Sequence, residues 1–232
     1  ETGNNLIGNN KNIAVIGDSF AMGWGVNDQQ TFAALIEEDT KIKTYNLGVS
    51  GYATERSLIR LKKSNLLNKI DTVIIQYCPN DFRENQSHSN KKTLRDEQKA
   101  YEMILTEKLS FFKRLRKAIR YSFIIPFEVL NFERDQIGWK GHDVLFEEIL
   151  KKYSFLSSKK IIVISMNGPG INFYNFPDNI SPQFSNLRYL NIKYNEDDFF
   201  SVDGHLNVKG HKKVAKILSN YIAPSRTICS VI

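Results

Sequence analysis

One short stretch, an apolar run followed by Gly-Asp-Ser, constrains the fold of this chain most. Residues 13–16 read Ile-Ala-Val-Ile, and Gly17, Asp18 and Ser19 follow at once. A continuous apolar run that ends in turn residues is typical of a parallel strand buried on both faces. Open α/β sheets place their chemistry at the carboxyl ends of such strands. Taken alone, the stretch fits a plain turn and a nucleophile loop equally well.

Strand and helix patterns alternate along much of the remaining sequence. We expect strands at 12–17, within 41–47, and at 71–77, 160–166 and 187–192, and helices at 29–39, 53–68, 142–156 and 208–222. Such alternation is typical of right-handed crossovers between parallel strands. The sequence therefore predicts an α/β fold, a three-layer α/β/α sandwich around a five-stranded parallel sheet, in a single domain over residues 1–232.

Residues 82–157 interrupt this alternation and are predicted to form a helical insertion on the same domain. The insertion begins with a strongly polar stretch, and a basic helix is expected over 98–123, ended or kinked by Pro126. Apolar residues recur at helical spacing in this basic helix, so we expect one face to dock on the α/β core. The alternative is that its basic face attracts an anionic glycan or lipid headgroup through Lys113, Arg114, Lys117 and Arg120.

The formal net charge of +7 is compatible with anionic partners in general. We expect no nucleic-acid partner, because the sequence has no zinc-finger spacing, RNP-like aromatic strand or basic zipper. No apolar run approaches the roughly 18 residues of a membrane span. The chain begins with Glu1, without an initiator Met or a signal peptide, so an upstream export signal or anchor could have been removed. An extracytoplasmic location is favoured over a cytoplasmic one.

Four loops carry side chains suited to nucleophilic catalysis, and all four can converge on one edge of the predicted sheet. A serine hydroxyl becomes a good nucleophile when an imidazole takes its proton and a carboxylate orients that imidazole. Ser19 is the candidate nucleophile, His205 its base and Asp203 the orienting group. The backbone N–H groups of Ser19 and Gly51 and the side-chain amide of Asn80 are the candidate oxyanion donors. Glycine at position 51 lets the backbone approach a substrate closely.

This constellation resembles the SGNH hydrolases, also called the GDSL esterase/lipase family. Residues 17–20, Gly-Asp-Ser-Phe, look like the first family block, with Phe where Leu is usual. Residues 46–51 are similar to the second block, Asn80-Asp81 matches the end of the third, and Asp203 and His205 fall in the last. The resemblance implies a flavodoxin-like SGNH hydrolase fold, the serine triad and oxyanion hole named above, and neither a metal nor an organic cofactor.

The sequence departs from the family pattern in two places. Cys78 stands where the third block usually has glycine, and Pro79 follows it, which stiffens the loop that carries Asn80. In the last block Asp203 precedes His205 by two residues, where the family usually has three. This shorter spacing also looks like that of bacterial polysaccharide O-acetylation proteins related to this fold. Asp198 is the fallback orienting residue.

The predicted function is carboxylic ester hydrolysis through an acyl-enzyme on Ser19. The resemblance suggests short acyl esters, with O-acetylated glycan as the first expectation and lipid as the second. One alternative is an O-acyltransferase, in which a sugar hydroxyl replaces water in the second step. The other is a non-catalytic module of the same fold that binds glycan or protein.

The remaining candidate residues are given structural interpretations. We expect His211 on the surface of the last helix, and His88 and His142 lie in polar stretches without metal-ligand spacing. Asp18 is expected to act as a turn or hydrogen-bonding residue of the nucleophile loop. Cys78 is expected to be a small buried apolar residue rather than a second nucleophile.

Overall fold

The structure of the protein is a computed structural model that describes residues 12–78, 81–82, 84–85, 142–166, 176 and 184–223. Within these residues a five-stranded sheet has the order β2-β1-β3-β4-β5, and every neighbouring pair is parallel. The strands are β1 (Asn12–Ile16), β2 (Thr44–Asn46), β3 (Ile70–Tyr77), β4 (Lys160–Ser165) and β5 (Leu187–Leu190). This is the flavodoxin-like strand order, in which ligands bind at the carboxyl ends of the strands.

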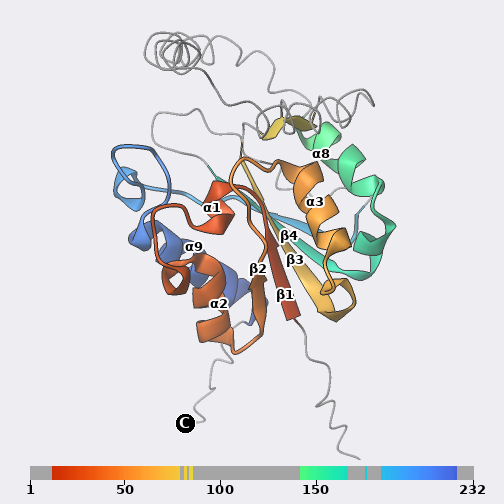
Figure 1. Cartoon of the computed structure of the whole chain (residues 1–232), viewed down its shortest axis with the longest axis horizontal. Helices are drawn as coiled ribbons and strands as arrows, with labels where there is room; N and C mark the ends of the chain where they lie inside the picture. Colours follow the sequence, from red (N-terminus) through yellow and green to blue (C-terminus); the bar gives the residue numbers. More distant parts are fainter. Residues whose placement is uncertain are drawn as a thin grey trace, which may run out of the picture.

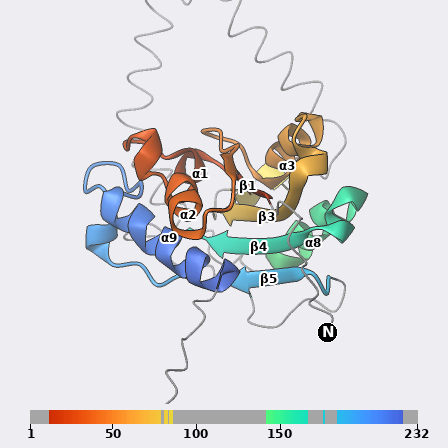
Figure 2. The same cartoon turned by 90° about the horizontal axis from the view of Figure 1, so that it is seen from below.

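Helices cover both faces of the sheet, so the fold is the three-layer sandwich that the alternation predicts (Figures 1 and 2). One face carries α2 (Phe32–Thr40) and α9 (Val208–Ile222), and the other carries α3 (Thr54–Lys63) and α8 (His142–Lys151). The four-residue helix α1 (Ser19–Met22) lies at the carboxyl end of β1. Short 3₁₀ turns complete the described elements, namely η1 (Asp28–Gln30), η2 (Leu67–Lys69), η4 (Ser154–Ser158) and η5 (Glu196–Asp198).

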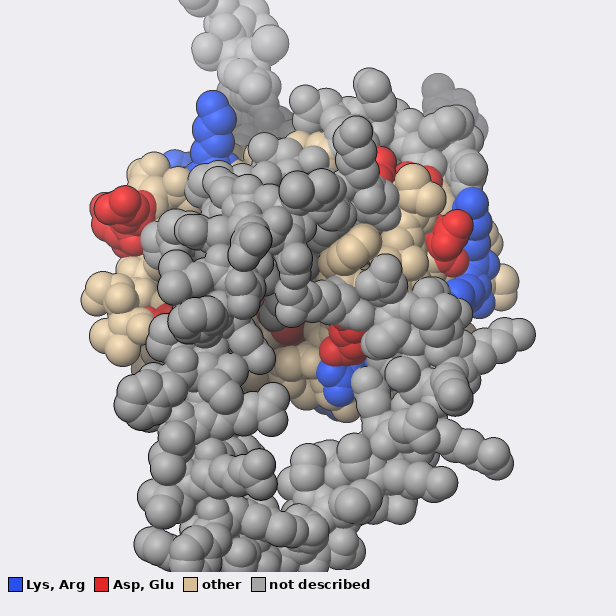
Figure 3. Space-filling view, turned by 90° about the horizontal axis from the view of Figure 1, so that it is seen from above, with Lys and Arg blue, Asp and Glu red and all other residues tan. Residues whose placement is uncertain are grey.

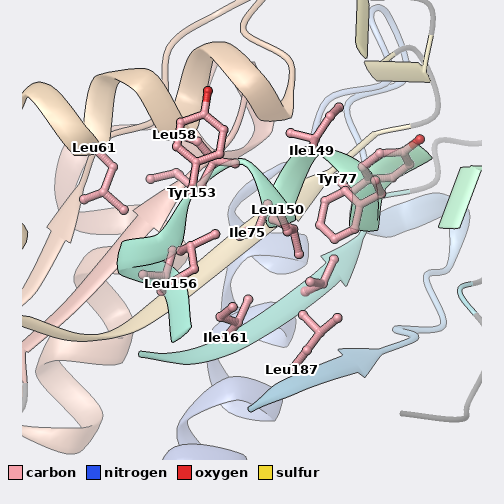
Figure 4. Packing of buried hydrophobic residues seen from close by; sticks show 14 of the residues in the cluster. Leu58, Leu61, Ile75, Tyr77, Ile149, Leu150, Tyr153, Leu156, Ile161 and Leu187 are labelled. Atoms are coloured by element: carbon pink, nitrogen blue, oxygen red, sulfur yellow. The ribbon is translucent and has the colours of Figure 1, made fainter. Parts of the chain in front are cut away.

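The core is split into two clusters because successive residues of a strand point to opposite faces. On β1, Ile13 and Val15 pack in the cluster of α2 and α9, whereas Ala14 and Ile16 pack in the cluster of α3 and α8. All four side chains are at most 1% exposed. Figure 4 shows the second cluster, where Leu58 of α3 and Ile149 of α8 cover the sheet. The unbroken apolar run of β1 thus follows from burial on both faces.

Three helices are shorter than the ranges that periodicity predicts, because local backbone structure sets where they begin or end. The helix expected over 29–39 begins at Phe32, because 28–30 form a 3₁₀ turn and the Thr31 hydroxyl accepts a hydrogen bond from Ala34 N at 3.3 Å. The helix expected over 53–68 ends at Lys63, because the backbone of Ser64 is extended. The helix expected over 142–156 ends at Lys151, and a 3₁₀ turn follows.

The prediction that His211 lies on the surface is wrong. Its side chain is 1% exposed, and its Nδ1 accepts a hydrogen bond from Phe32 N at 3.1 Å. His211 shares one face of α9 with Val214, Ala215 and Leu218, at the spacing of a buried helical stripe. Burial lowers the pKa of His211 to about 4, so the ring is neutral at physiological pH.

Most of the predicted insertion, including the basic helix over 98–123, lies outside the described residues. Its described end, α8, packs on the sheet through Phe146 and Ile149, which are fully buried. No helix within the described ranges is long and apolar enough to cross a membrane. That the chain forms a single domain stays a prediction.

Candidate active site

Ser19 is placed at the carboxyl edge of the sheet by a tight turn after β1. The turn begins at Gly17, whose φ of +150° belongs to a region that side chains rarely adopt. A Cβ at this glycine would lie 2.3 Å from the Gln76 Oε1 atom. Asp18 then caps α1, and its Oδ1 accepts a hydrogen bond from Phe20 N at 2.9 Å. The prediction that Asp18 is a hydrogen-bonding residue of this loop is confirmed.

Gln76 on β3 is hydrogen-bonded to the same turn. The sequence motifs did not indicate this residue. The side chain is fully buried, and its Oε1 accepts hydrogen bonds from Asp18 N at 2.9 Å and Ala21 N at 3.3 Å. These bonds fix the start of α1 to the centre of the sheet. One signal was available, since a polar residue within a β-branched strand buried on both faces needs internal partners.

His205 lies beside Ser19, although 186 positions separate them in sequence. The His205 Nε2 atom is 2.8 Å from the Ser19 Oγ, which is hydrogen-bonding distance. Local contacts fix the loop that carries His205. Phe199 and Leu206 form an antiparallel bridge, and the Asn207 side chain accepts hydrogen bonds from the first N–H groups of α9. The phenyl ring of Phe20 packs on the imidazole with 5.0 Å between ring centroids.

Asp203 lies on the other side of the imidazole. Its Oδ1 accepts a hydrogen bond from His205 N at 3.0 Å and lies 3.5 Å from His205 Nδ1. Its Oδ2 accepts a hydrogen bond from the indole N–H of Trp24 at 3.1 Å. The pKa of Asp203 is lowered, chiefly by the hydrogen bond from the His205 backbone. The positive charge that His205 can carry and the hydrogen bond from Trp24 are smaller causes in the same direction. The carboxylate is therefore ionised and close to the imidazole at neutral pH.

Asp198, the fallback orienting residue, uses its carboxylate elsewhere. The side chain is fully buried, and its Oδ2 accepts hydrogen bonds from Asn195 N at 2.8 Å and Lys213 Nζ at 2.6 Å. Through these two hydrogen bonds, Asp198 connects the turn before Phe199 to α9. The two-residue spacing between Asp203 and His205 places Asp203, rather than Asp198, beside the imidazole.

The loop after β2 carries Gly51 next to the start of α3. Gly51 has φ +75°, and apart from Gly51 itself and its two neighbours in the chain, no heavy atom of the described residues lies within 4 Å of a Cβ built on it. Asn46 ties this loop to α1, because its Nδ2 donates to Ala21 O at 2.8 Å while its Oδ1 accepts from Gly48 N at 3.0 Å. Asn80, the third predicted oxyanion donor, lies outside the described residues.

Two buried carboxyl groups lie beneath this edge. Asp81 is 3% exposed, and its Oδ2 accepts a hydrogen bond from the Thr54 hydroxyl at 3.4 Å. Burial, with the nearby charge of Asp18 as the next cause, raises the pKa of Asp81 well above its usual range. Burial likewise raises the pKa of Asp18. Figure 3 shows this side of the molecule, where both acidic and basic side chains are visible among the described residues.

The described side chains show no site suited to a metal ion. No group of three or more His, Cys, Asp or Glu side chains among them has the geometry to hold one. His88 lies outside the described residues, and His142 begins α8. Cys78 is partly buried and forms no disulfide within the described part of the chain.

No protein-family model and no curated protein matches the chain. A G-D-S-L family lipolytic protein from Desulfitobacterium hafniense has 14% identity and a TM-score of 0.49, over 90% of this chain and 98% of that one. The lipase/acylhydrolase from Enterococcus faecalis has 16% identity and a TM-score of 0.47, over 91% and 95%.

A two-domain esterase active on acetylated mannans has 14% identity and a TM-score of 0.48, over 91% of this chain and 48% of that one. The chain is therefore similar to G-D-S-L lipolytic proteins and to carbohydrate esterases. These are the proteins that its sequence motifs resemble.

Proposed function

We propose that the protein is a serine-dependent hydrolase of carboxylic esters that works through an acyl-enzyme. The observation that carries the proposal is the 2.8 Å distance between Ser19 Oγ and His205 Nε2. A neutral imidazole at that distance accepts the hydroxyl proton as the oxygen attacks a carbonyl carbon. The Asp203 carboxylate, 3.5 Å from His205 Nδ1, stabilises the imidazolium that results.

The reaction then takes two steps with the same groups. In the first, Ser19 Oγ bonds to the ester carbon, and the imidazolium of His205 returns its proton to the departing alcohol oxygen. In the second, His205 removes a proton from water, the hydroxide oxygen attacks the acyl carbon, and Ser19 leaves with that proton. Each tetrahedral intermediate carries a negative oxygen that needs positioned donors.

We assign the oxyanion donors to the backbone N–H groups of Ser19 and Gly51 and the side-chain amide of Asn80. The Ser19 N–H lies at the first position of α1, and Gly51 is exposed with open space where a side chain would be. Removing one such donor costs about 2.7–4 kcal/mol of transition-state stabilisation in other enzymes. The proposed substrates are short acyl esters, with O-acetylated glycan first and lipid second.

A second candidate function is O-acyl transfer to a sugar hydroxyl, which uses the same groups. It is favoured by the two-residue spacing of Asp203 and His205, which resembles that of polysaccharide O-acetylation proteins. Measuring acetyl release with and without a glycan acceptor separates the two functions. If the donor ester loses its acetyl group only when the glycan acceptor is present, and the acetyl group is recovered on the glycan, the protein is a transferase.

A fluorophosphonate probe tests the nucleophile directly. We expect the probe to label Ser19 and the protein to hydrolyse p-nitrophenyl acetate, and Ser19→Ala to abolish both while leaving the circular dichroism spectrum unchanged. Ser157→Ala, which changes an exposed serine of η4, is the matched control and keeps both activities. Labelling and hydrolysis that survive Ser19→Ala contradict the proposal. A wild type that neither reacts nor hydrolyses any acyl ester supports a non-catalytic binding module.

The orienting carboxylate is tested by comparing two asparagine variants. Asp203→Asn is expected to lower kcat by up to about 10⁴, the loss when the triad aspartate of a serine protease is replaced by asparagine. Asp198→Asn weakens the bond to Lys213 and is expected to lower the melting temperature while kcat stays within about threefold of wild type. The reverse pattern would assign the orienting role to Asp198.

A further inference from the structure

Trp24 donates its indole N–H to the carboxylate that faces the imidazole. The Trp24 Nε1 atom lies 3.1 Å from Asp203 Oδ2, and its ring lies 6.0 Å from the His205 ring, centroid to centroid. The indole is 49% exposed, so packing in the core does not account for its position. An indole has one polar group, a donor, and here Asp203 is its acceptor.

The turn that carries Trp24 is built to hold it in one place. Trp24 lies between Gly23 and Gly25, whose φ values of +89° and +83° both fall in the left-handed region. A Cβ at Gly23 would lie 2.4 Å from Thr31 Cγ2, and one at Gly25 would lie 2.8 Å from Phe200 Cε2. Both flanking positions are therefore limited to glycine by conformation and by close contact.

The same turn is hydrogen-bonded to the nucleophile. The N–H groups of Gly23 and Trp24 both donate to the carbonyl oxygen of Ser19, each at 3.0 Å. Trp24 is thus fixed relative to Ser19, the residue on which the serine chemistry is proposed to occur.

The Asp203 side chain needs a contact from outside its own loop, because the hydrogen bond within that loop does not fix its position relative to α1. Its side chain is 40% exposed. The hydrogen bond from His205 N to Oδ1 spans two residues, so it shapes the turn without tying the turn to α1. The Trp24 bond joins positions that are 179 apart and connects the two loops directly.

We propose that Trp24 is a positioning residue, whose indole N–H holds the Asp203 carboxylate against His205 and so keeps the imidazole aimed at Ser19. The inference rests on the proposed function, since it assigns a role within the same triad. The Trp24 ring and the Phe20 ring both pack near the imidazole and limit its rotation. The indole thereby couples the nucleophile turn to the turn that carries the base.

Trp24→Phe tests this role, because it keeps an aromatic ring and removes the N–H. With p-nitrophenyl acetate, a small neutral ester, we expect kcat to fall about tenfold or more, the value of one hydrogen bond to a charged group, while KM changes less than about twofold. The same substitution in an Asp203→Ala background is expected to cause no further loss, because its acceptor is already gone. Val202→Ala, at a neighbouring side chain that is 96% exposed, is the matched control and keeps the wild-type kcat.

A second measurement detects the hydrogen bond without relying on catalysis. The chain has two tryptophans, so the two indole N–H resonances in a ¹⁵N spectrum can be assigned by Trp24→Phe. We expect the Trp24 resonance to move in Asp203→Ala and to stay in place in Val202→Ala.

Three results would overturn the role of Trp24. The first is a Trp24 indole N–H resonance whose chemical shift is the same in Asp203→Ala as in wild type. The second is a Trp24→Phe enzyme with wild-type kcat. The third is an equal loss from Trp24→Phe with and without the Asp203 carboxylate, since the tryptophan would then act independently of it. An inactive wild type that the fluorophosphonate does not label overturns the proposed function itself, and the catalytic role of Trp24 with it.

Discussion

Two histidines near the start of α9 have opposite environments. His205 keeps its Nε2 at the edge of the sheet beside Ser19, whereas His211 is buried against α2 with its Nδ1 bound to a backbone N–H. The ring of His211 also stacks on Phe32 at 5.7 Å. A protonated Nδ1 cannot accept that bond, and burial disfavours the charged ring. His211 therefore works as a neutral packing residue that joins α2 to α9.

His211 should make the protein sensitive to acid. Its folded-state pKa of about 4 lies below the unfolded value near 6.5, so its contribution to stability is complete above pH 6.5 and is lost as the pH falls towards 4. A difference of this size is worth about 3 kcal/mol in the free energy of unfolding. We expect His211→Gln, which keeps an acceptor for Phe32 N, to reduce the loss of stability between pH 6.5 and 4 in urea titrations. An unchanged loss would show that other groups carry the acid sensitivity.

At the residue scale, the sequence motifs predicted side chains that the structure brings together. Ser19, His205 and Asp203 are adjacent, as expected from loops that meet at one sheet edge. Trp24 and Gln76 were missed because their partners lie far along the chain, and no local motif encodes such contacts. Gln76 stood out as a polar residue in an apolar strand, whereas Trp24 carried no signal apart from its flanking glycines.

At the scale of elements, periodicity predicted the sheet and the four longer described helices but not the element that carries Ser19. Helix α1 has four residues, too few for any helical repeat to be visible in the sequence. It is defined by its neighbours instead, through the Asp18 cap, the Gln76 side chain and the Asn46 amide. Helix ends were also misplaced, because capping by residues such as Thr31 overrides the apolar pattern.

Close packing of the β2–α3 loop against α1 predicts a strong effect of Gly48→Ala. A Cβ at this position would lie 2.4 Å from Met22 N and 2.7 Å from the Ala21 carbonyl carbon, which are backbone atoms that cannot turn aside. The loop or α1 must therefore move. We expect a loss of about 1–3 kcal/mol in the free energy of unfolding, as for other overpacked sites. Because α1 carries Ser19, we also expect kcat to fall about tenfold or more.

Urea denaturation and ester kinetics on the same preparation separate these two effects. Lys62→Ala, at an exposed position near the end of α3, is the control for an added alanine that contacts nothing critical. If Gly48→Ala retains the wild-type kcat, α1 does not depend on this contact for its position.

At the scale of the whole molecule, the sheet separates two apolar clusters that share only its backbone. Ile36 of α2 lies in one cluster and Ile149 of α8 in the other, and both side chains are fully buried. The sheet edge that carries Ser19 is supported from the side of α2 and α9, where Ala21, Phe199 and Leu206 pack. Asn46 and Gln76 anchor the turn that carries Ser19, and Leu206 anchors the loop that carries His205 through its bridge to Phe199.

This division predicts that small cavities on opposite faces have additive effects. Ile36→Val and Ile149→Val each remove one buried methylene-sized group, at a cost of about 0.5–1.5 kcal/mol. Since the two side chains lie in different clusters, the double variant should lose the sum within about 0.5 kcal/mol in urea denaturation.

The matched comparison is Ile75→Val combined with Ile149→Val, both in the cluster of α3 and α8. Here we expect a departure from the sum larger than about 0.5 kcal/mol, because neighbouring side chains relax into a shared space. Strong coupling between Ile36 and Ile149 would mean that strain crosses the sheet through its backbone. In that case the two clusters form one packing unit, and a cavity on either face would also be expected to disturb the edge that carries Ser19.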